Sequence, residues 1–173
     1  MARQNWNGKT LLLIQEACRH GETRLAAQMQ LATSADQRAT VLAGIYVAAA
    51  TGIIGAVAVV SSSGSAVISL PLYVASGATA AAFLCGAILC VLATLPVDFW
   101  MAGNEPEEWY EDIEKNTPLE VAIGEQMEHF NDHILDNKRT IDGNARKFLW
   151  GALIGIAAPL VGILTAGVVC LWF

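Results

Sequence analysis

The sequence predicts an all-α membrane protein with three transmembrane helices and a cytoplasmic helical bundle. Two uncharged stretches carry this prediction. No Asp, Glu, Lys, Arg or His occurs from Ala39 to Val97 or from Phe148 to Phe173. Part of every core helix in a water-soluble domain faces water, so such a domain rarely leaves stretches of this length uncharged. Because about 20 apolar residues cross a bilayer, the first stretch has room for two crossings and the second for one.

The charged residues are concentrated in the remaining segments. Of the 173 residues, 54% are hydrophobic and 15% are charged, and the net charge is −6. All but three of the 16 acidic residues lie in residues 98–147. No polybasic strip occurs, so we expect no nucleic-acid partner. The scattered cysteines, with no CxxC pair, are expected to be packing residues rather than disulfide or zinc ligands: Cys18, Cys85, Cys90 and Cys170.

Residues 1–40 are expected to form a cytoplasmic N-terminal helix. Lys9 is followed by too few apolar residues for a cleavable signal peptide. From Thr10 onward, apolar residues recur at helical spacing, at Leu11, Ile14, Cys18, Leu25, Met29 and Ala32. Nothing between Thr33 and Val41 breaks a helix, so this helix should continue into the first span.

Residues 41–97 are expected to hold two transmembrane helices, joined by a short outer loop near 62–71. The first covers roughly Val41 to Ser61, and the second covers roughly Leu72 to Leu95 and stops at Pro96. Residues 98–147 are expected to be a cytoplasmic acidic loop, with about one helical turn in 103–116, followed by a helix.

Thr117 as N-cap and Pro118 in the first turn mark the start of that last helix. Its apolar stripe needs a partner, and the N-terminal helix is the economical choice; the stripe consists of Leu119, Ile123, Met127, Phe130, Ile134 and Ile141. The helix should run on into the third span, residues 148–173.

Orientation follows from the basic residues, which flank the spans and are absent from the loop at 62–71. The N-terminus and residues 98–147 are therefore expected on the cytoplasmic side, and the C-terminus on the outer side.

Two spans carry small residues at regular spacing, which lets helices approach closely in lipid. The first span has Gly44, Ala48, Gly52 and Ala56, and the third has Gly151, Gly155, Ala158, Gly162 and Ala166. These faces either pack within one chain or join copies of it. Beside the lipid bilayer, a homo-oligomer is the expected partner.

Several function classes are disfavoured. No Asp, Glu, Lys, Arg or His lies inside a span, which argues against proton pumps, ion-coupled transporters and voltage sensors. No GxSxG, P-loop or clustered Ser/His/Asp occurs, so we expect neither an enzyme nor a cofactor. His129 and His133 have a ligand-compatible spacing, but EHFNDH is not HExxH, and a solvated polar face is favoured over a metal site.

Asp36 and Arg38 precede the first span in Ala35-Asp36-Gln37-Arg38-Ala39. One interpretation is a positive-inside Arg with a polar flank. The segment also resembles the Pycsar transmembrane effectors, in which an Asp, a basic residue and an Ala lead into the first span. PVDF followed by GNEPEEW after the second span, and the basic stretch from Lys138 to Lys147, agree with that layout.

The resemblance implies a bacterial anti-phage effector in the inner membrane. It would respond to a cyclic pyrimidine nucleotide and impair membrane integrity through rearrangement of oligomeric helices. A phosphate site would then draw on the few basic residues, and Trp109 could stack a base; the candidate ligand contacts are Arg38, Trp109, Arg139 and Arg146. Two alternatives stay open, a non-enzymatic membrane scaffold or accessory subunit and a holin-like pore former.

Overall fold

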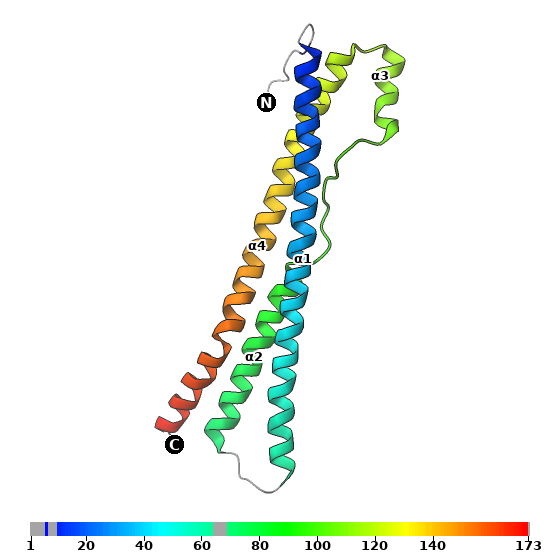
Figure 1. Ribbon diagram of the computed structural model, residues 1–173. Coiled ribbons are helices and arrows are strands. Elements are labelled where there is room, and N and C mark those ends of the chain that lie inside the picture. The colour runs from blue at the N-terminus through cyan, green and yellow to red at the C-terminus, as the bar shows by residue number, and fades with distance from the viewer. Residues whose placement is uncertain (1–5, 7–9, 64–68, 173) are drawn as a thin grey trace. The chain divides into compact units, whose positions relative to one another are not determined.

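The chain folds into helices of very unequal length. The computed structural model describes Trp6, residues 10–63 and residues 69–172; part of the expected outer loop, 64–68, lies outside the described residues. The helices are α1 (Leu11–Ser62), α2 (Leu70–Leu92), η1 (Pro106–Trp109), α3 (Tyr110–Lys115) and α4 (Leu119–Trp172). No strand occurs in the described part of the chain (Figure 1).

Three of these helices, α1, α2 and α4, are long and apolar enough to cross a membrane. Their most apolar 18-residue segments have mean hydropathies of 2.1, 2.0 and 2.3, respectively. The predicted fold class, all-α with three candidate transmembrane helices, is confirmed to that extent. The predicted run of one helix from Thr10 into the first span, and of another from Leu119 into the third, is also what α1 and α4 show.

The chain divides into two compact units. Unit 1 comprises residues 1–33 and 97–141, and unit 2 comprises residues 34–96 and 142–173. In unit 1, the first part of α1 packs against the first part of α4. Ile14 and Leu25 of α1 are buried, and a Cβ on Gly21 would lie 3.1 Å from the ring of Phe130. Gly21 thus lies inside a continuous helix, at a tight contact with Phe130.

Unit 2 holds the three apolar helices side by side (Figure 1). Its core is a cluster from all three helices: Ala39, Ala43, Tyr46, Ala87 and Cys90, with Leu42, Phe83 and Phe148 packed against it. The rings of Tyr46 and Phe83 are 5.6 Å apart and tilted by 40°. Near the other end of α1, the hydroxyls of Ser61 and Tyr73 share a hydrogen bond.

Hydroxyl groups along the apolar helices bond to their own helix. The side chains of Thr51, Ser61, Thr79 and Thr165 each donate to the carbonyl four residues earlier, at 2.7–2.9 Å. Such a bond satisfies the donor without a second helix or water. Pro159, inside α4, has no N–H to donate to the carbonyl of Gly155.

The structure differs from the sequence expectation at both ends of α2 and in the acidic segment. The helix α2 begins at Leu70, because Pro71 is tolerated in a first helical turn, and it ends at Leu92, where the Ala93 N–H bonds to the Leu89 carbonyl. The acidic segment 103–116 holds η1 and α3, which is more helix than the one turn expected. An ion pair between Glu111 and Lys115 supports α3.

The end of α3 is a Schellman motif. Asn116 adopts a left-handed conformation (φ 49°), and the Thr117 N–H donates to the Asp112 carbonyl at 2.9 Å. After this turn the Pro118 carbonyl accepts from Ala122, and α4 begins at Leu119.

Candidate functional site

The small residues of α4 pack against other helices of the same chain. Gly151, Gly155, Ala158 and Gly162 are buried, and Ala166 is half-buried. A Cβ on Gly151 would lie 2.9 Å from the Gly86 carbonyl oxygen, and one on Gly86 would lie 2.9 Å from the Gly151 carbonyl oxygen. Real Cβ atoms do not come that close, so α2 and α4 meet here backbone to backbone.

Two further α4 glycines receive side chains from the other helices of unit 2. The ring of Tyr46 on α1 occupies the space beside Gly155, and the hydroxyl of Thr79 on α2 occupies the space beside Gly162. The small-residue face of α4 therefore packs against α1 and α2.

The small residues of α1 have the opposite environment. Gly44, Ala48, Gly52 and Ala56 are all exposed, and a Cβ on Gly44 or Gly52 would meet nothing within 4 Å. At 3.6 residues per turn they lie across the helix from its buried row, Ala39, Ala43, Tyr46 and Ala50. We call these four residues the open small-residue face of α1. Within one chain, this face has no packing partner among the described residues.

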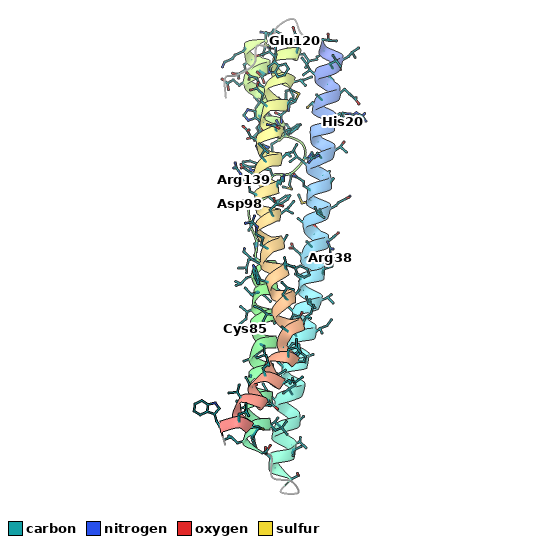
Figure 2. All side chains as sticks on the ribbon, turned by 90° about the vertical axis from the view of Figure 1, so that its left-hand side faces the viewer. His20, Arg38, Cys85, Asp98, Glu120 and Arg139 are labelled. Carbon is teal, nitrogen blue, oxygen red and sulfur yellow. The ribbon has the colours of Figure 1, made fainter. Side chains whose placement is uncertain are left out.

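The juxtamembrane motif does not form an ion pair among the described residues. Asp36 and Arg38 are two positions apart on α1, and side chains at this spacing do not face each other. The Nε of Arg38 donates instead to the Ser34 carbonyl at 3.1 Å. Both side chains are exposed, and Figure 2 labels Arg38 on α1.

Arg38 borders an open groove between α1 and α4 in unit 2. The groove has a volume of about 510 Å³ and is lined by Ser34, Gln37, Arg38, Val41, Leu42, Ile45 and Phe148. Beyond the polar residues at one end, its walls are aliphatic and aromatic.

The other candidate ligand contacts are not among the residues that line this groove. Arg146 is exposed on α4 in unit 2, while Trp109 and Arg139 belong to unit 1. Trp109 ends η1, next to Glu107 and Glu108, and is half-buried. The guanidinium of Arg139 pairs with Asp136 at 2.9 Å. These acidic neighbours weaken both residues as phosphate or nucleotide contacts.

Comparison with protein-family models, with curated proteins and with solved structures found no match. The function of this chain must therefore be inferred from its own residues.

A polar cluster in unit 1 was missed by the sequence analysis. The side chain of Asn137 is 1% exposed; its Oδ1 accepts from the Trp100 N–H at 2.9 Å, and its Nδ2 donates to the Trp100 carbonyl at 2.8 Å. The Trp100 ring stacks on His133, with centroids 4.0 Å apart and planes at 2°. Asn137 lies three and seven positions after Ile134 and Phe130, so a polar residue within the apolar stripe was the available signal.

The segment before η1 thus runs along α4. Asn104 and Gln126 pair through two amide hydrogen bonds, four residues after Trp100 and eleven residues before Asn137. Four extended residues cover about 13 Å and eleven helical residues about 16 Å, so the spacings match an antiparallel course. Burial of His133 and the nearby His129 lower its pKa, against the opposing effect of Glu108, Asp132 and Asp136.

Within the described residues, no group of three or more His, Cys, Asp or Glu side chains is arranged to hold a metal ion. The rings of His129 and His133 lie 6.4 Å apart. The ring of His133 stacks on Trp100, so this face of α4 packs against the segment before η1.

Trp6 also packs in unit 1. Its ring covers Gly124, where a Cβ would collide with it, and its indole N–H donates to Glu128 at 3.2 Å.

Proposed function

We propose that this chain is a membrane effector of a bacterial anti-phage defence system, triggered by a cyclic pyrimidine nucleotide and impairing inner-membrane integrity. Copies of the chain associate through the open small-residue face of α1. The observation that carries this proposal is the contrast between the two small-residue faces: that of α4 is buried within the chain, and that of α1 is exposed.

The physical argument concerns helix association in lipid. Lipid tails are as apolar as leucine, so spans associate through close van der Waals packing rather than through the hydrophobic effect. Gly44, Ala48, Gly52 and Ala56 offer a smooth surface for such contact. A second copy that presents the same face is a complementary partner.

In the proposed topology, the N-terminus and the segment before the last span form a cytoplasmic bundle, and the C-terminus lies on the outer side. The distribution of Lys and Arg supports this orientation. The contacts between α1 and α4 within unit 1, at Gly21 and Phe130 and from the Gln28 amide to the Ile134 carbonyl, support the bundle.

The nucleotide trigger is proposed from the resemblance around Asp36 and Arg38. A signal received by the cytoplasmic helices would change how α1 and α4 pack, because both helices run without a break into the apolar segments. The spans carry no Asp, Glu, Lys, Arg or His that could form a charged pore lining, so the proposed outcome is a leaky or distorted bilayer and no ion-selective channel.

The test is to express the chain in a bacterium and follow membrane potential with a dye, with and without cyclic UMP or cyclic CMP. We expect depolarisation only with nucleotide. Depolarisation without nucleotide would replace the effector by a holin-like pore former. An intact membrane in every condition, with folded protein present, would replace it by a scaffold or accessory subunit.

A matched pair of variants tests the association surface. Gly52→Leu places a bulky side chain on the open small-residue face, whereas Gly77→Leu makes the same change on α2, where a Cβ also meets nothing within 4 Å. We expect Gly52→Leu to abolish chemical cross-linking between copies and depolarisation, and Gly77→Leu to retain both. Equal behaviour of the two variants would show that association does not use this face.

A further inference from the structure

The groove beside Arg38 combines two kinds of surface in a fixed order along α1. Ser34, Gln37 and Arg38 occupy one end, and Val41, Leu42 and Ile45 follow on the next two turns, all at spacings of three and four. These residues therefore share one face of the helix, with hydrogen-bond donors first and apolar side chains after them. Phe148 of α4 forms the facing wall.

The donors at the polar end are available. Arg38 uses its Nε on the Ser34 carbonyl, and no carboxylate among the described residues pairs with its terminal N–H groups. The side chains of Ser34 and Gln37 are exposed beside it. The charged residues of unit 2 are Asp36, Arg38, Asp142, Arg146 and Lys147, and all of them precede the uncharged stretches. The polar end of the groove thus lies where the apolar part of α1 begins.

The dimensions fit a lipid. From Arg38 to Ile45, α1 rises about 10 Å at 1.5 Å per residue. One leaflet contributes about half of a 30 Å hydrocarbon core, so this apolar length matches the upper part of an acyl chain whose phosphate lies beside Arg38.

We infer that this groove binds one anionic glycerophospholipid. Its phosphate accepts hydrogen bonds from the Arg38 guanidinium and from Ser34 and Gln37, and one acyl chain packs against Val41, Leu42, Ile45 and Phe148. Charge complementarity at the rim favours an anionic headgroup, since basic pockets beside spans recruit such lipids. The apolar walls offer no hydrogen-bonding group to a nucleotide base, so the groove suits a lipid better than a cyclic nucleotide.

The experiment is lipid retention by the full chain, measured by native mass spectrometry after extraction from vesicles of equal phosphatidylglycerol and phosphatidylcholine with identical acyl chains. We expect preferential retention of one phosphatidylglycerol per chain. Arg38→Gln should lower that retention about fivefold, the factor associated with one basic residue near an anionic surface. Arg24→Gln, which removes an exposed arginine 14 residues before Arg38 on α1 and outside the groove, should leave retention unchanged.

Two further variants keep the test independent of folding. Arg38→Lys preserves the charge and should retain phosphatidylglycerol, while Phe148→Ala opens the wall and should lower retention of both lipids. Equal retention of the two lipids, or equal losses with Arg38→Gln and Arg24→Gln, would overturn the inference. Displacement by inorganic phosphate alone would reduce the groove to an anion site, and displacement by cyclic UMP would assign it to the nucleotide; either result also overturns it.

This inference goes beyond the proposed function and does not depend on it. Lipid retention is measured without a trigger, so an inactive chain that retains phosphatidylglycerol would refute only the effector. An active chain that retains none would refute only the lipid site.

Discussion

Tyr46 of α1 lies in the space that a side chain on Gly155 of α4 would occupy, and its hydroxyl donates to the neighbouring Ala152 carbonyl at 3.0 Å. A ring thus replaces the missing side chain, and one hydrogen bond fixes its position. The contact joins two spans that are far apart in the sequence.

The first prediction concerns this contact. Gly155→Ala should lower the free energy of unfolding in detergent by about 1–3 kcal/mol, because the added methyl group collides with the Tyr46 ring in a packed interface. Unfolding by SDS, followed by circular dichroism, measures the change. Gly167→Ala on the same helix, where a Cβ meets nothing within 4 Å, is the control and should unfold like the wild type. Equal stabilities of the two variants would contradict the packing described.

The second prediction concerns Asn137. Asn137→Ala should lower stability by about 1–3 kcal/mol, because two hydrogen bonds to the Trp100 backbone are lost. The Trp100 amide should also exchange its hydrogen faster, which exchange mass spectrometry detects. Asn131→Ala removes an exposed amide from the same helix and should change neither quantity. Unaltered exchange at Trp100 in Asn137→Ala would show that the pairing is not formed.

The third prediction is a pH dependence from His133. Burial, with His129 nearby, lowers its pKa in the folded chain below the ordinary value near 6.5, so the unfolded chain binds the proton more readily. The stability contributed by neutral His133 is complete above about pH 6.5 and declines as pH falls toward the folded-state pKa.

Thermal unfolding of wild type and His133→Gln between pH 5 and 8 measures this effect. The difference between the unfolding temperatures of the two proteins should shrink as pH falls. His20 is an exposed histidine on α1 and serves as the control. In a His20→Gln background, the stability difference caused by His133→Gln should change with pH as it does in the wild-type background. An NMR titration of His133 with a pKa above 6.5 would refute the sign.

The fourth prediction concerns Trp6. Gly124→Ala should displace its ring, because a Cβ at position 124 collides with the indole. With 5-fluorotryptophan incorporated and the Trp6 signal assigned by Trp6→Phe, the ¹⁹F resonance should move toward its solvent-exposed value. Gly143→Ala, on the same helix in open space, should leave that resonance in place and fits the helix at least as well as glycine. An unshifted signal in Gly124→Ala would mean that Trp6 packs elsewhere.

Much of the fold could be predicted because it depends on local patterns. The uncharged stretches predicted three long apolar helices, and helical spacing predicted which side chains of residues 11–32 are sheltered, such as Ile14 and Leu25. Continuous propensity between Thr33 and Val41 predicted the unbroken α1. Charge and periodicity are read over neighbouring residues, so one sequence suffices for them.

The sites could be predicted only in part, because they depend on which face meets which helix. Both small-residue faces recur at helical spacings of three or four residues, and only the packing distinguishes Gly155, beneath a ring, from Gly52, in open space. The stacking of Trp100 on His133 joins positions 33 residues apart, which no local pattern specifies.

The hydroxyls that bond to their own helix have a consequence for permeability. Thr51, Ser61, Thr79 and Thr165 already donate to a carbonyl of their own turn, so a file of water molecules between these helices would find few donors to replace its lost hydrogen bonds. A passage through associated copies would then have to be lined in part by lipid headgroups. Planar-bilayer recordings should accordingly show irregular current bursts of variable size, and their amplitude should follow lipid composition rather than ion type.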